Sequence, residues 1–85
     1  MYEIDWKKKA RKQLDKIADG HTRIEIKNAV SALADLPSAS QVKKLTNHQY
    51  GYRLRVGRYR VFFDVAEAIQ IVSIEEVKKR DDRTY

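Results

Sequence analysis

Apolar and acidic side chains alternate over residues 2–6, which predicts a short strand at the start of the chain. Apolar residues then recur at helical spacing within a basic segment and predict a first helix from about residue 6 to residue 19. Asp5 is placed to act as the N-cap of this helix, and Gly20 lies where a glycine commonly follows a helix end. The start of the chain therefore predicts one strand and one helix.

A second helix is predicted by a capping box, in which Thr22 and Glu25 lie three residues apart and bond each other's backbone N–H groups. Its apolar residues keep a helical spacing until Pro37, which ends the helix. The connection at residues 20–21 is short, so we expect the two helices to form an antiparallel hairpin. Residues 38–49 are expected to form a loop.

From residue 50 onward the pattern is typical of strands, the last of them over residues 69–77. The dipeptide Gly57-Arg58 predicts a type II′ hairpin turn, because this turn takes glycine at its first position. A two-residue turn fixes the register of the hairpin, so that Arg55 lies opposite Arg60. Alternation gives one apolar face that suits the helices: Tyr52, Leu54, Val56, Tyr59, Val61 and Phe63. The other face, called the arginine face below, consists of Arg53, Arg55, Arg60 and Phe62, with Asp64 further along.

These elements follow one another in the order β-α-α-β-β-β within a single domain of residues 1–85. The order predicts an α+β fold in which a two-helix hairpin packs on one face of a mostly antiparallel four-stranded sheet. The pattern does not determine the order of the strands within that sheet.

The composition narrows the classes of function. The 85 residues contain no cysteine, which excludes disulfides and thiolate metal sites and favours the cytoplasm. No apolar run approaches the roughly 18 residues of a membrane span, and the N-terminus lacks the apolar part of a secretory signal. Lysine and arginine outnumber aspartate and glutamate by 18 to 12, which gives a net charge of +6. Such an excess is typical of domains that bind nucleic acid or an acidic protein, although a solvated basic surface has the same composition.

The pairing of Arg55 with Arg60 is unfavourable for folding, because like charges directly opposite each other on a ladder cost roughly 0.2–1 kcal/mol. The same arrangement is useful for binding, since clustered guanidinium groups hold phosphates and an adjacent Phe62 can stack on a base. The alternative is that Asp64 neutralises the arginines, or that they spread into solvent. We therefore predict a phosphate-binding site on the arginine face.

The run from Tyr52 to Phe63, followed by a hydrophobic strand and a basic tail that ends in Tyr85, resembles the RelE/ParE toxin superfamily. The resemblance covers nearly the whole chain. It implies the toxin half of a toxin–antitoxin pair, neutralised by a small acidic antitoxin in a heteromeric complex. RelE-like members cut messenger RNA in the ribosomal A site, whereas ParE-like members poison DNA gyrase.

The resemblance implies a set of catalytic residues at matching positions: Arg53, Arg55, Arg60, Arg80 and Tyr85. Lys79 and Arg83 compete with Arg80 for its position in the tail, and both are expected to contact RNA, as is Phe62 from its place on the arginine face. His48, in the loop before the hairpin, is expected to contact RNA as histidines do in some relatives, and the alternative is an ordinary surface histidine. The two positions before the turn are often lysines in RelE, and both are arginines in this chain. Because arginine stays protonated, these residues can stabilise negative charge but cannot act as general bases. Proton transfer would then fall to Tyr85 or to the ribosome.

The reaction that the resemblance implies needs neither a metal nor another cofactor. The 2′-OH of RNA attacks the neighbouring phosphate and yields a 2′,3′-cyclic phosphate and a 5′-OH, so DNA is not a substrate. Two alternatives remain at this point. The chain can be a gyrase inhibitor of the ParE type, or a nucleic-acid-binding module without catalytic activity.

Overall fold

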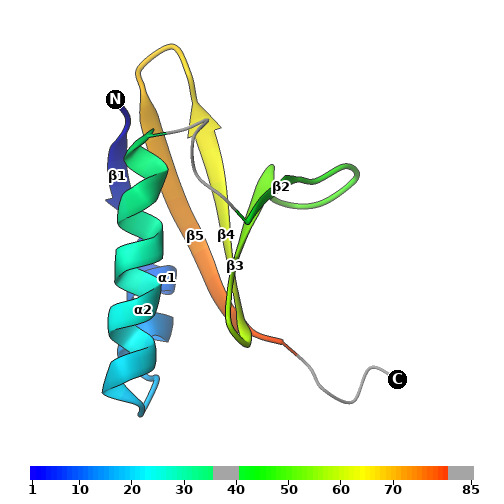
Figure 1. Cartoon of the computed structure of the whole chain (residues 1–85). Coiled ribbons are helices and arrows are strands. Elements are labelled where there is room, and N and C mark those ends of the chain that lie inside the picture. The colour runs from blue at the N-terminus through cyan, green and yellow to red at the C-terminus, as the bar shows by residue number, and fades with distance from the viewer. Residues whose placement is uncertain (36–40, 81–85) are drawn as a thin grey trace.

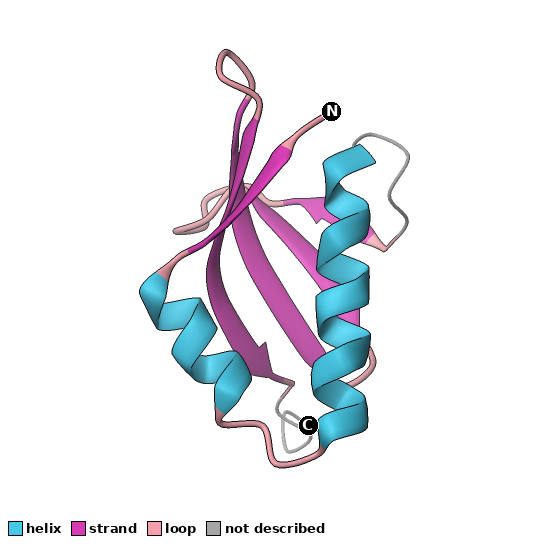
Figure 2. Cartoon of the chain, turned by 90° about the vertical axis from the view of Figure 1, so that its left-hand side faces the viewer, coloured by secondary structure: helices cyan, strands magenta, loops and turns pink. Residues whose placement is uncertain are grey.

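The computed structural model describes residues 1–35 and 41–80, and it has two helices on one face of a five-stranded sheet (Figures 1 and 2). The strand order is β1-β5-β4-β3-β2, with β1 and β5 parallel and the other neighbours antiparallel. This arrangement confirms the predicted α+β class. Within these residues, no helix is long and apolar enough to cross a membrane. The elements are β1 (Glu3–Trp6), α1 (Lys8–Asp15), α2 (Gly20–Ser31), the 3₁₀ helix η1 (Ala32–Asp35), β2 (Val42–Lys44), β3 (Tyr52–Val56), β4 (Tyr59–Ala66) and β5 (Ile71–Lys79).

The sheet has one strand more than predicted. Strand β2 lies within residues 38–49, which were expected to form a loop, and it pairs antiparallel with β3 at the edge of the sheet. Its three residues, one valine and two lysines, are too few to show an alternating pattern. Exposed lysines on a short strand are a common protection of a sheet edge.

The first helix is shorter than predicted, and its ends differ. Asp5 is not its N-cap, because Asp5 lies within β1 and pairs with Ser73 of β5. Lys7 holds the N-cap position, and its side chain makes no capping hydrogen bond. The backbone N–H of Lys7 donates to Ile74 O at 2.9 Å. Pairing between β1 and β5 therefore delays the start of the helix to Lys8. Gly20, expected just past the first helix, is the first residue of α2.

The second helix is capped by Asp19 and not by the predicted Thr22–Glu25 box. The carboxylate of Asp19 accepts the N–H of His21 at 3.1 Å and the hydroxyl of Thr22 at 2.8 Å. Thr22 thus contributes to the cap as a donor to Asp19. The hydrogen bond from Thr22, followed by that from the His21 N–H, lowers the pKa of Asp19 below its usual value. Pro37, predicted to end this helix, lies outside the described residues.

The lowered pKa of Asp19 predicts a dependence of stability on pH. The ionised carboxylate stabilises the folded chain above the ordinary aspartate pKa of about 3.9, and this stabilisation is lost as the pH falls through the lower, folded-state value. In Asp19→Asn, which keeps a capping oxygen, the melting temperature should fall less steeply below about pH 5 than in the parent chain. Circular dichroism melts test this. Asp15→Asn, at an exposed aspartate of α1, should retain the parent slope.

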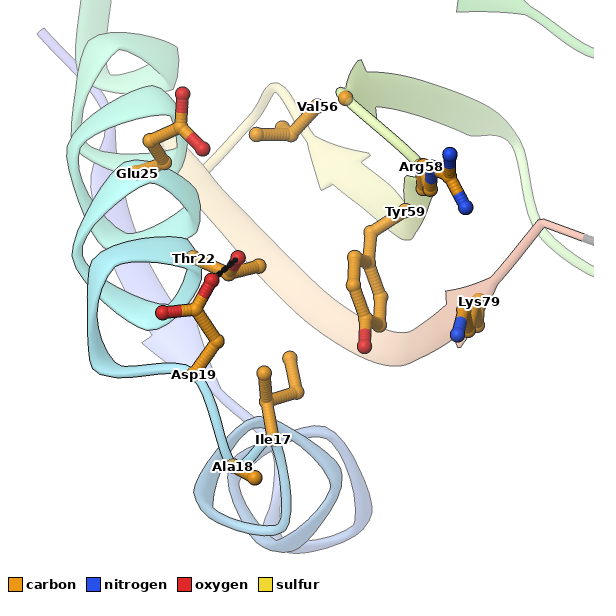
Figure 3. A pocket seen from close by; sticks show the side chains of 10 residues that line it. Ile17, Ala18, Asp19, Thr22, Glu25, Val56, Arg58, Tyr59 and Lys79 are labelled. Atoms are coloured by element: carbon orange, nitrogen blue, oxygen red, sulfur yellow. Dashed lines mark hydrogen bonds between the residues drawn. The ribbon is translucent and has the colours of Figure 1, made fainter.

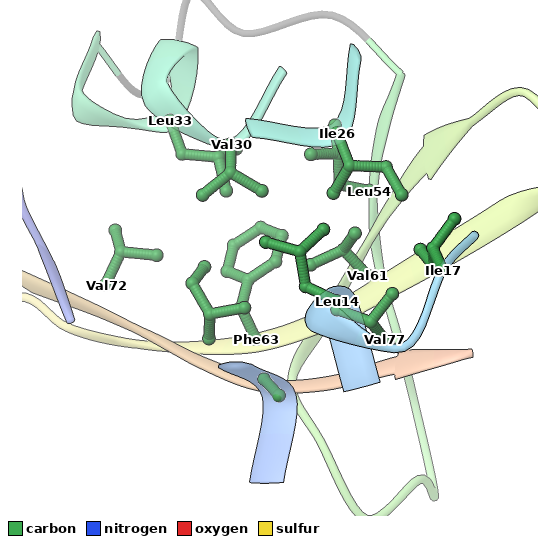
Figure 4. Close-up of a cluster of buried hydrophobic side chains, with 12 residues drawn as sticks. Leu14, Ile17, Ile26, Val30, Leu33, Leu54, Val61, Phe63, Val72 and Val77 are labelled. Carbon is green, nitrogen blue, oxygen red and sulfur yellow. The ribbon is translucent and has the colours of Figure 1, made fainter. Parts of the chain in front are cut away.

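The core lies between the helices and the sheet (Figure 4). Phe63 is fully buried at its centre and stacks on Tyr52, with ring centroids 5.4 Å apart. The predicted apolar face of the hairpin is confirmed, since all six of its residues belong to this core or pack against it. The last strand runs from Ile71 to Lys79 and not from Ile69 to Val77, because Ile69 lies exposed in the turn before it. The largest fully buried side chains are Phe63, Leu14, Ile26, Leu33, Ile74, Val30, Val61 and Val72.

A side chain of α1 extends the hydrogen bonding of β5 beyond the end of β1. Trp6 is the last residue of β1 and pairs with Ile74, so the N–H of Val77 lies past that strand. Gln13 Oε1 accepts this N–H at 2.7 Å in a partly buried position. The amide of Gln13 therefore takes the place of a strand neighbour and ties α1 to the sheet.

Replacing Gln13 should destabilise the fold. Gln13→Ala leaves the partly buried N–H of Val77 without its acceptor, which should lower the free energy of unfolding by about 1–2 kcal/mol. Gln13→Glu keeps an oxygen at the same distance along the side chain and should lose less. Urea unfolding curves measure both values. A loss in Gln13→Glu as large as that in Gln13→Ala would contradict the prediction, because glutamate retains both the oxygen and most of the side-chain volume.

Candidate functional site

The β3–β4 hairpin has the turn and register that the sequence predicts. Gly57 has a φ of 55°, in the left-handed region that favours glycine, whereas Arg58 has no positive φ, as in a type II′ turn. Arg55 pairs with Arg60, and Arg53 pairs with Phe62. The arginine face therefore lies on the side of the sheet away from the helices.

Four of the predicted residues line one small cavity of about 70 Å³: Arg53, Arg55, Arg60 and Arg80. The first three come from the hairpin, and Arg80 follows the end of β5. Arg80 is brought to this place by its backbone, whose N–H donates to Arg58 O at 2.6 Å and so continues the pairing of β5 with β4. Residues from three neighbouring parts of the sheet thus surround one cavity with positive charge.

The charge of this cavity is not balanced by acidic residues among the described ones. Within residues 1–35 and 41–80, no ion pair involves Arg53, Arg55 or Arg60. Asp64, considered as a neutralising group, accepts the N–H of Gly51 at 2.6 Å. The Nε of Arg53 is buried and has no hydrogen-bond partner in the described part of the chain. A buried donor without a partner is costly, and a bound anion would supply one.

Phe62 does not offer the exposed stacking surface that was predicted. Only 7% of the residue is exposed, because the loop before β3 folds over it. The ring of His48 stacks on Phe62 with centroids 5.1 Å apart and an angle of 14° between the planes. Tyr50 packs against the same ring at 5.9 Å. His48 is exposed and stacks on Phe62 of the arginine face, but it is not among the residues that line the cavity. Its contact with RNA therefore stays a prediction.

Lys79 lies on the other side of the sheet and is not brought together with the arginines. It pairs with Tyr59 and lines a cavity of about 460 Å³ between the hairpin and the start of α2 (Figure 3). This cavity also contains the carboxylates of Asp19 and Glu25, which would repel a phosphate. Arg83 and Tyr85, the remaining predicted site residues, lie outside the described residues.

Two residues near the site were not predicted. Tyr50 joins the ring cluster over Phe62, and Lys78 lies directly across the ladder from Arg60. The register of β4 and β5 shifts between Phe62 and Phe63, which leaves Glu75 unpaired as a β-bulge. Because of the bulge, Lys78 and not Lys79 shares the side of Arg60. No signal in the sequence identifies Lys78, because its side of the sheet depends on this bulge.

The comparisons with known proteins agree with this architecture. The isolated RelE toxin of E. coli matches with a TM-score of 0.81 and 20% identity, over 99% of this chain and 89% of its own. A chain of the archaeal RelE–RelB complex from Pyrococcus horikoshii matches with a TM-score of 0.79 and 23% identity, over 95% of this chain and 97% of its own. A chain of the RelBE2 toxin–antitoxin complex from Mycobacterium tuberculosis matches with a TM-score of 0.77 and 18% identity, over 93% of this chain and 98% of its own.

These identities show a shared fold, and the family itself is shown by the sequence. No curated protein matches the sequence significantly. The model of a family described as the ParE toxin of the type II toxin–antitoxin system parDE matches residues 4–83, which is nearly the whole chain. The chain therefore belongs to the RelE/ParE superfamily and is a toxin of a type II toxin–antitoxin system.

Proposed function

We propose that this toxin is a metal-independent endoribonuclease that cuts messenger RNA in the A site of the ribosome and so inhibits translation. The observation that supports this proposal is the cavity lined by Arg53, Arg55, Arg60 and Arg80. Its small volume of about 70 Å³ suits a phosphate group better than a nucleoside. The +6 net charge of the chain adds a general attraction for RNA.

In the proposed reaction, the 2′-OH attacks the adjacent phosphorus while the bond from phosphorus to the 5′ oxygen breaks. The proton of the 2′-OH leaves, a proton reaches the 5′ oxygen, and the products carry a 2′,3′-cyclic phosphate and a 5′-OH. The guanidinium groups bind the phosphate and stabilise the negative charge that grows on it. Since they remain protonated, proton transfer is assigned to Tyr85 or to groups of the ribosome, and Arg83 to RNA contact.

We further propose that an acidic antitoxin neutralises the toxin in a heteromeric complex in the cytoplasm. The structural neighbours include complexes of RelE with RelB, and the excess positive charge of this chain favours an acidic partner. Finding a short open reading frame for an acidic protein beside the gene, whose product restores growth when both are expressed, would support this partner.

The nuclease proposal is tested by inducing the toxin in cells and mapping the 5′ ends of a translated message by primer extension. We expect new ends within the translated region and none in an untranslated RNA. Growth arrest with intact messages would contradict the proposal. It would direct attention to gyrase, the second candidate, which the match to the ParE family model favours. A supercoiling assay with purified gyrase separates the two, because a gyrase inhibitor blocks supercoiling without any ribosome.

A further inference from the structure

The loop between β2 and β3 is held firmly on the arginine side of the sheet. Figure 1 shows it projecting away from the helices. Leu45 N–H donates to Gly51 O at 2.8 Å and closes the loop. Gly51 N–H donates to Asp64 Oδ1 at 2.6 Å and ties the loop to β4. Tyr50 N–H donates to His48 Nδ1 at 3.0 Å and fixes the imidazole ring. These hydrogen bonds tie the loop to the sheet and hold the His48 ring against the loop backbone.

The imidazole of His48 has one covered face and one open face. The covered face lies on Phe62 at 5.1 Å with nearly parallel planes, and Tyr50 borders it at 6.0 Å. The residue is exposed, so its outer face meets solvent. Phe62 pairs across the ladder with Arg53, which lines the arginine cavity. A flat ring thus lies open to solvent beside the proposed phosphate site.

The hydrogen bond from Tyr50 also assigns the tautomer of His48. Because Nδ1 accepts a backbone N–H, the neutral ring carries its hydrogen on Nε2. The exposed edge of the ring therefore presents a hydrogen-bond donor. This arrangement suits recognition of a base better than general-base catalysis.

We propose that the outer face of His48 is a stacking surface for a nucleobase of single-stranded RNA next to the phosphate held by the arginines. The inference rests on the proposed function and names a subsite within it. Stacking of one base on an aromatic ring strengthens binding by roughly 5- to 150-fold. Phe62, buried underneath, supports the imidazole, and the Nε2–H of His48 can donate to an acceptor on the base or ribose.

The test compares His48→Ala with His48→Phe. Both variants lose the Nδ1 acceptor for the Tyr50 N–H, so any difference between them measures the effect of an aromatic ring at this position. For cleavage of mRNA on programmed ribosomes, His48→Ala should raise KM about tenfold with little change in kcat, and His48→Phe should remain near the parent. His21→Ala removes the other histidine, on the helix side, and serves as the control.

Two results would overturn the proposal. If both variants lose kcat equally, His48 acts in proton transfer. If His48→Ala lowers stability to urea but cleaves normally per folded molecule, the ring only covers Phe62. Should the parent chain not cut RNA at all, the proposed function fails, and the subsite is tested separately with a short single-stranded RNA that contains 2-aminopurine. Quenching of its fluorescence by the parent and His48→Phe, but not by His48→Ala, supports the subsite, and equal quenching by all three contradicts it.

Discussion

Arg60→Ala should reduce mRNA cleavage by about 100- to 1,000-fold, the usual effect of removing one preorganised group that stabilises charge in a transition state. Arg60 lines the cavity with three other arginines and makes no ion pair with an acidic residue among the described ones. Arg60→Lys should recover part of the activity, because an ammonium keeps the charge and loses the planar two-pronged geometry.

The same substitution should not destabilise the protein. Arg60 lies opposite Arg55, and removing one of two facing like charges should raise the free energy of unfolding by up to roughly 1 kcal/mol. Cleavage is therefore expected to fall while the free energy of unfolding rises. A variant that merely failed to fold would lose both. Primer extension measures the first and urea unfolding the second. Arg11→Ala, at an exposed arginine of α1, is the matched control, and an equal loss of cleavage there would mean that only the overall charge matters.

Phe63→Ala should have the largest effect on stability. Phe63 is fully buried among residues of both helices and the sheet and stacks on Tyr52. Truncation of a buried phenylalanine costs about 3–5 kcal/mol, a large part of the roughly 5–15 kcal/mol that stabilises a small domain. A considerable fraction of the variant should be unfolded at physiological temperature.

Urea unfolding of three chains checks this value. Phe63→Leu retains most of the apolar volume and should lose less than Phe63→Ala. Ile69→Ala, in the turn before β5, removes a side chain from a residue that is 65% exposed and should change stability by less than about 0.5 kcal/mol. If Phe63→Ala unfolds near the parent midpoint, the core between the helices and the sheet contributes less than its burial implies.

The features that were predictable are those that a short stretch of sequence determines. The dipeptide Gly57-Arg58 fixes its turn by itself, and the register from Tyr52 to Phe63 follows from that turn. The proximity of Arg53, Arg55 and Arg60 is a direct result of this register. Arg80 came from the resemblance to a family, since nothing in its own neighbourhood indicates where it lies.

The features that were missed depend on distant parts of the chain. The start of α1 is delayed by pairing of Asp5 with Ser73, and the burial of Phe62 depends on where the loop around His48 folds. The bulge at Glu75 exchanges the sides of Lys78 and Lys79, and no local pattern announces it. Sequence alone therefore predicts the hairpin well and the surroundings of the hairpin poorly.

The pairing of β1 with β5 also determines when, during synthesis, the fold of the toxin can be completed. Glu3 of β1 pairs with Ile71 of β5, so β1 can join the sheet only after β5 has been synthesised. Arg80 reaches the cavity only when β5 has joined β4. A nascent chain that does not yet contain β5 therefore lacks both the complete sheet and the arginine cavity. Under the proposed function, the ribosome that makes the toxin meets the complete arginine cavity only after β5 and Arg80 have been synthesised.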